Sequence, residues 1–186
     1  MNFKTSKDKN PFLRRWVLFN GIAGLIGTIA IFVLGYFVVT IFYPGENNLI
    51  IGFCPGIVVG YAQWLVLKKY LKISAWWIFA SAIGMGIPDV IAVILFELNG
   101  TETLIGMPFD LIFRLFIGGL ITGILQFKML KPFTQKYAFW IIASALAWAT
   151  VLFGGPFGGV ILGLITGIFL SRFIEFSNQE DFKKND

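Results

Sequence analysis

Three ionisable residues lie inside stretches that are otherwise apolar, and they are the strongest candidates for chemistry in this chain. Asp89 directly follows Pro88, and Asp110 lies one helical turn before Arg114. A charged side chain within a membrane helix costs about 2.5–3.5 kcal/mol on insertion scales, so such residues are candidates for function by default. Their combined formal charge is −1, which favours a cation or a proton over an anion.

Two interpretations of these residues stay open. In the first, Asp89 and Asp110 neutralise Arg114, and the charges only fix how the helices pack. The i, i+4 spacing of Asp110 and Arg114 permits such pairing on one helix face. In the second, the three residues line a cavity open to the outer side and bind a polar ligand, an ion or a proton.

Motifs for catalysis are absent from the sequence. There is no HExxH, GxSxG or Walker motif and no carboxylate-rich metal cluster. The chain has no histidine, which excludes imidazole-based triads and histidine-ligated haem or zinc. Cys54 is the single cysteine and can form no disulfide within the chain. We therefore expect no enzyme, no cofactor and no metal site.

The elements that must hold these residues are membrane helices. Of the 186 residues, 57% are hydrophobic and 13% are charged, which is unlike a soluble domain. A helix needs about 20 mainly apolar residues to cross the ~30 Å hydrocarbon core. The predicted spans are residues 16–42, 50–67, 75–96, 109–130, 138–153 and 156–173. The last two are separated by Gly154-Gly155-Pro156, which favours a hairpin over one helix of about 54 Å.

The positive residues predict the orientation in the membrane. Lysine and arginine precede the first span and then occupy alternate loops, whereas the opposite loops carry only Glu46, Glu97 and Glu102. Cytoplasmic loops are enriched in positive residues, so both termini are expected in the cytoplasm. The net charge of +5 then reflects topology, and no nucleic-acid partner is expected. Residues 1–186 form a single membrane domain with short, mobile tails at 1–10 and 176–186.

An internal repeat predicts how the spans are arranged. Residues 75–86 match residues 138–149 at six of twelve positions, and residues 56–64 match residues 119–127 at the same offset. Parallel repeats of this kind are related by an axis along the membrane normal. The expected fold class is an all-α integral membrane protein with six transmembrane helices, built as three degenerate helical hairpins with approximate threefold pseudosymmetry.

Polar residues recur about one turn from the predicted cytoplasmic ends of the spans. They are Asn20, Gln63, Ser81, Gln126 and Ser144, and the third copy has Leu170 where a glutamine would fall. Hydrogen bonds between helices contribute about 0.6–2 kcal/mol each, so we interpret these residues as locks, with a cytoplasmic vestibule as the alternative. The nearby aromatic residues predict an interfacial belt. They are Trp16, Trp64, Trp76, Trp77, Trp140, Tyr70 and Tyr137.

Glycines spaced by four recur near the middle of every second span. They are Gly56 and Gly60, Gly119 and Gly123, and Gly163 and Gly167. In lipid, helices gain contact energy by close approach of their backbones, which small residues allow. We therefore expect these glycines to pack helices together; a glycine-lined pore or ligand groove is the alternative.

The segments GxxxGxxQWLVLKK (56–69) and AWWIFASAIG (75–84) resemble a group of bacterial polytopic membrane proteins. That group repeats GxxxGxxQWLVL and AxxWxxAS segments. The resemblance covers residues 50–86 well and residues 113–149 in degraded form, where Phe127-Lys128-Met129 replaces Trp-Leu-Val. It implies an architecture and carries no activity.

The sequence thus predicts a non-enzymatic, multi-pass protein of a bacterial cell membrane. Its expected function is that of a small subunit that binds a ligand or ion, or assists its transport. A scaffold, assembly or immunity protein that packs against partner spans is the alternative, and an intramembrane enzyme is the third. Besides the lipid bilayer, the expected partners are another membrane protein or a second copy of the chain.

Overall fold

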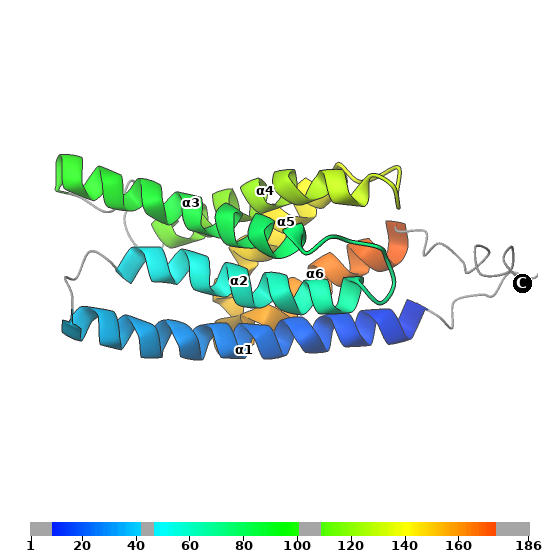
Figure 1. Ribbon diagram of the computed structural model, residues 1–186, viewed down its shortest axis with the longest axis horizontal. Helices are drawn as coiled ribbons and strands as arrows, with labels where there is room; N and C mark the ends of the chain where they lie inside the picture. Colours follow the sequence, from blue (N-terminus) through cyan, green and yellow to red (C-terminus); the bar gives the residue numbers. More distant parts are fainter. Residues whose placement is uncertain (1–8, 42–46, 101–108, 174–186) are drawn as a thin grey trace, which may run out of the picture.

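The computed structural model describes residues 9–41, 47–100 and 109–173, and every regular element within these ranges is a helix. The elements are α1 (Lys9–Ile41), α2 (Asn47–Leu67), α3 (Trp76–Asn99), α4 (Phe109–Leu130), α5 (Phe139–Thr150), the 3₁₀ helix η2 (Val151–Phe157) and α6 (Gly158–Phe173) (Figure 1). The prediction of an all-helical chain is confirmed. Helix α1 begins within the predicted tail 1–10, whereas residues 1–8, the tail 176–186, Glu46 and Glu102 lie outside the described residues.

Four helical stretches are long and apolar enough to cross a membrane. They are Pro11–Leu34, Trp76–Leu95, Phe109–Leu130 and Phe139–Arg172, and Gly52–Leu67 of α2 is apolar but shorter. The last of the four is not one continuous helix, because Gly155 has φ 50° and ψ −127°. Glycine adopts this backbone conformation without a steric penalty. The helix is therefore interrupted at the Gly154-Gly155-Pro156 sequence.

The helices form a closed ring of neighbours. Each helix packs against the next along the chain, from α1 to α6, and α6 packs against α1. Figure 1 shows α1 and α2 running side by side along the bundle, with α3 and α4 on its other side. Short connections join α2 to α3 and α4 to α5 at the same end. In the first of them, the Ser74 hydroxyl accepts the backbone N–H of Trp76 at 3.2 Å, where α3 begins.

Helices α5 and α6 are each shorter than the other four α-helices. Gly159, at the start of α6, lies against Gly24 of α1, and Gly167 lies against Trp16. Helices α1 and α6 are therefore antiparallel. Helix α1 continues from Gly24 to Ile41, beyond the start of α6. In Figure 1, α6 lies alongside only the half of α1 that carries its N-terminus.

Large aromatic side chains fill the core near the short connections. Trp16, Trp77 and Trp140 are at most 1% exposed and belong to one cluster with Phe12 and Phe169. The prediction that these three tryptophans form an interfacial belt is therefore wrong. Trp76, by contrast, is 53% exposed and lies on the outer surface. A tryptophan can be buried when its indole N–H has a hydrogen-bond acceptor. The N–H groups of Trp16, Trp77 and Trp140 each have one.

Candidate functional site

The three ionisable residues form one charged cluster, which we define as Asp89, Asp110 and Arg114. The Nη2 atom of Arg114 lies 2.6 Å from Oδ2 of Asp110, one turn away on α4. Its Nη1 atom lies 3.6 Å from Oδ1 of Asp89 on α3. The structure thus brings together the residues that the sequence singles out. Both carboxylates are buried, at 6% exposure for Asp89 and 2% for Asp110.

The charged cluster also touches a third helix. A Cβ atom added at Gly52 of α2 would collide with Oδ2 of Asp89, so α2 passes directly over the carboxylate. A cavity of about 80 Å³ lies beside the cluster and is lined by Pro88, Ala92 and Phe113 as well as by Asp110 and Arg114. Its walls are mostly apolar. The cluster is therefore a compact, internally paired group that ties α3 to α4.

A second polar set links the helices nearer the short connections. Trp77 donates its indole N–H to Oε1 of Gln63 at 3.1 Å. Gln63 in turn donates from Nε2 to Oδ1 of Asn20 at 2.9 Å. Asn20 donates to the backbone carbonyl of Trp16 at 2.8 Å. This chain of hydrogen bonds runs from α3 through α2 to α1 inside the bundle.

The same arrangement recurs one repeat later. Trp140 donates to Oε1 of Gln126 at 3.0 Å, and Gln126 donates to Oγ of Ser81 at 2.8 Å. Ser81 donates to the backbone carbonyl of Trp77 at 3.1 Å. In both repeats the tryptophan follows its glutamine by 14 residues. This chain of hydrogen bonds runs from α5 through α4 to α3.

A threonine takes the place of glutamine at the third position of this kind. Trp16 donates to Oγ1 of Thr166 on α6 at 2.9 Å, and Thr166 donates to the carbonyl of Leu162 at 2.6 Å. Leu170 is the residue that aligns with the two glutamines in the sequence repeat, but the acceptor is Thr166, which the sequence analysis does not single out. The repeated GLITGI hexapeptide could have identified it, because it aligns Thr166 with Thr122. Ser144, predicted as a lock, is buried against Gly119 and Gly123.

The six predicted glycines all lie where one hairpin meets the next. Gly56 and Gly60 face Ser81 on α3, and a Cβ atom on either would come within 2.7 Å of it. Gly119 and Gly123 face α5 in the same way. Gly163 and Gly167 face α1, where a Cβ atom would come within 2.9 Å of Asn20 or Trp16. All six are buried, so their close-packing surfaces are occupied within this one chain.

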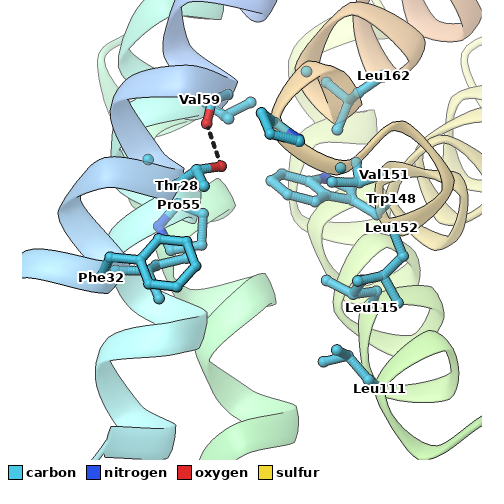
Figure 2. Close-up of a pocket in the computed structure, with 16 residues that line it drawn as sticks. Thr28, Phe32, Pro55, Val59, Leu111, Leu115, Trp148, Val151, Leu152 and Leu162 are labelled. Atoms are coloured by element: carbon cyan, nitrogen blue, oxygen red, sulfur yellow. Dashed lines mark hydrogen bonds between the residues drawn. The ribbon is translucent and has the colours of Figure 1, made fainter. Parts of the chain in front are cut away.

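The helix bundle also holds an apolar cavity that the sequence analysis does not predict. Its volume is about 470 Å³, within the roughly 300–1,000 Å³ typical of ligand pockets. Figure 2 shows Phe32 of α1 and Pro55 of α2 facing Leu115 of α4, Trp148 of α5 and Leu152 of η2 across it. The charged cluster does not line this cavity.

The lining of the cavity has two side chains with a polar group, the indole N–H of Trp148 and the hydroxyl of Thr28. Thr28 is the one side chain with a hydroxyl, and that hydroxyl donates to the carbonyl of Gly24 at 2.8 Å. Burying a polar group without a hydrogen bond is costly, whereas apolar surface gains from burial here. The cavity therefore suits hydrocarbon.

No family model, curated protein or solved structure matches this chain. The resemblance to bacterial polytopic membrane proteins thus stays a prediction. Among the described residues, the charged cluster, the hydrogen-bonded tryptophans and the apolar cavity are the features that bear on function.

Proposed function

We propose that this chain is a multi-pass membrane protein that embeds six helices in the bilayer as three hairpins and binds an apolar ligand between them. Both termini face the cytoplasm, and the protein catalyses no reaction. The orientation is supported by the charges at the short connections and at the end of α6, where Lys68, Lys128 and Arg172 are all exposed. Large exposed apolar side chains on the outer faces of the helices, such as Ile29 and Phe79, suit contact with lipid.

An approximate threefold relation between the hairpins is part of this proposal. Its support is the recurring indole donor at each junction between hairpins: Trp77 to Gln63, Trp140 to Gln126, and Trp16 to Thr166. The glycine pairs recur at the same three junctions. Equivalent contacts at equivalent places are what repeats around one axis would produce.

The apolar cavity is the single observation that carries the ligand-binding proposal. The alternative of ion binding at the charged cluster is less well supported, because Arg114 already pairs with both carboxylates. A scaffold that packs against partner spans would need an exposed small-residue face. The glycines that could form such a face are instead buried at the junctions within the chain. An intramembrane enzyme would need convergent titratable groups in a cleft at headgroup level.

The proposal is tested by filling the cavity. Leu115 lines the cavity from α4, whereas Phe113 lies outside its lining and is 42% exposed. We expect Leu115→Trp to lower the amount of co-purified apolar ligand by about tenfold, equivalent to about 1.4 kcal/mol of binding free energy. Native mass spectrometry in mild detergent measures the bound fraction directly.

Phe113→Trp on the same helix is the matched control and should leave the bound fraction unchanged. Equal occupancy in wild-type protein and Leu115→Trp would overturn the proposal. So would the recovery of wild-type protein with an empty cavity after extraction from its own membrane.

A further inference from the structure

We infer that the hairpin α5–η2–α6 turns back near the middle of the bilayer, and that the apolar cavity above the turn holds a hydrocarbon chain of an outer-leaflet lipid. This deepens the proposed function and rests on it for the cavity being a ligand site. It adds the chemical class of the ligand, the side from which it enters and the element that shapes the entrance.

The depth of the turn follows from the pairing of α6 with α1. The N-terminal end of α6 meets α1 at Gly24, nine residues from Arg15, the last basic residue before the apolar part of α1. Nine helical residues rise about 14 Å, roughly half of the ~30 Å hydrocarbon core. Helix α1 then continues to Ile41, which is far enough to reach the outer surface.

The contact between α5 and α4 gives the same depth for the turn as the contact between α6 and α1. Trp148, near the end of α5, packs against Gly119 of α4. Helix α4 starts ten residues earlier, at Phe109, so it extends about 15 Å beyond this contact. In the outer half of the membrane, α1 and α4 therefore lack the third hairpin that separates them in the inner half.

The turn itself is suited to membrane depth. Backbone polar groups in hydrocarbon must be paired within the protein. The N–H of Val151 donates to the carbonyl of Trp148, and the N–H of Gly158 donates to that of Gly155. Pro156 carries no N–H. The turn also presents Phe153 outward, at 76% exposure, which suits lipid rather than water.

The cavity lies at the turn of the third hairpin and continues beyond it along the long helices. The third hairpin lines it with Trp148, Leu152, Pro156 and Leu162, and the long helices line it with residues that include Phe32, Pro55 and Leu111. Figure 2 shows Leu111 and Leu115 following one another along α4 away from Trp148, so the cavity extends along the helix axis. The lining matches a hydrocarbon chain, because its polar side-chain groups are one hydroxyl (Thr28) and one indole N–H (Trp148), and no charged group there could hold a headgroup. The headgroup would stay at the outer surface.

The depth of the turn is tested with a spin label at Phe153→Cys, in full-length protein with Cys54→Ala and reconstituted in lipid vesicles. Phe37→Cys, near the outer end of α1 and 55% exposed, is the matched control. Oxygen should relax the label at 153 strongly and a water-soluble nickel reagent weakly, with the opposite balance at 37. Nickel accessibility at 153 equal to that at 37 would overturn the inference.

The occupant is tested by a photoreactive benzoylphenylalanine at Leu152, with Leu146 on the outer face of α5 as control. Phosphatidylglycerol supplied only to the outer leaflet should form an adduct at 152 that survives detergent washing, whereas any adduct at 146 is lost on washing. Leu115→Trp should abolish the adduct at 152. An adduct with a second copy of the chain, or none, overturns the inference. Native mass spectrometry that finds a bound non-lipid molecule overturns the inference alone and leaves the proposed function standing.

Discussion

Trp16 of α1 donates its indole N–H to the hydroxyl of Thr166 on α6 at 2.9 Å, across 150 residues of sequence. Both residues are at most 2% exposed. The bond joins the first described helix to the last, and it is the counterpart of the Trp77–Gln63 bond between α3 and α2. A buried indole N–H without an acceptor would cost about 1–3 kcal/mol, so this contact stabilises the closure of the ring.

Thr166→Val should therefore destabilise the protein, by about 1–3 kcal/mol, because it leaves the N–H of Trp16 buried without an acceptor. Thr122→Val is the matched control. Thr122 occupies the equivalent place in the preceding repeat, but its buried hydroxyl has no hydrogen-bond partner among the described residues. Valine there should be neutral or stabilising. Unfolding in mixed micelles titrated with SDS gives both values, and equal losses in the two variants would contradict the assignment.

Gln63 should show energetic coupling to Trp77. Replacing Gln63 by Leu removes the acceptor of the Trp77 N–H and the donor to Asn20. In Trp77→Phe that N–H is gone, so Gln63→Leu should cost less in this background than in the wild type. A double-mutant cycle measures the difference, which we expect near 0.6 kcal/mol, the average for membrane hydrogen bonds. Strict additivity of the two losses would show that the bond contributes nothing.

The sequence allowed the polar contacts to be predicted better than their surroundings. Amide and hydroxyl groups in apolar helices must find partners, so Gln63 and Gln126 could be placed between helices from composition and repeat alone. The burial of Trp16 could not be predicted. A tryptophan near a helix end resembles an interfacial anchor until the acceptor on a helix far along the chain is known.

The charged cluster was predictable for a local reason. Asp110 and Arg114 are one turn apart on one helix, and Asp89 lies on the preceding helix, so short-range geometry suffices. The apolar cavity depends instead on how far α5 and α6 reach relative to α1 and α4. That register is set by the contacts of Gly24 with Gly159 and of Gly119 with Trp148, which no local pattern reveals.

Arg114→Leu should be the most damaging change in the charged cluster. It leaves two buried carboxylates without their cation, and removal of one partner of a buried ion pair costs about 3–5 kcal/mol. Asp110→Asn should cost more than Asp89→Asn, because Arg114 lies 2.6 Å from Asp110 and 3.6 Å from Asp89. The yield of folded, monodisperse protein after extraction reports this order. Normal yield of Asp89→Asn with loss of function would instead identify the cluster as a working site.

Two glycine-to-alanine substitutions should separate close helix packing from helix propensity. A Cβ atom at Gly119 would lie 2.7 Å from the backbone carbonyl oxygen of Ser144, so α4 and α5 would have to move apart. At Gly27 the nearest atom would be Cα of Pro55 at 3.6 Å, which is an ordinary contact. Alanine in a helix gains up to about 1 kcal/mol over glycine. We therefore expect Gly27→Ala to raise the unfolding free energy or leave it unchanged, and Gly119→Ala to lower it despite the same gain in propensity. Both values come from the same SDS titration, and stabilisation by Gly119→Ala would show that α5 does not approach α4 this closely.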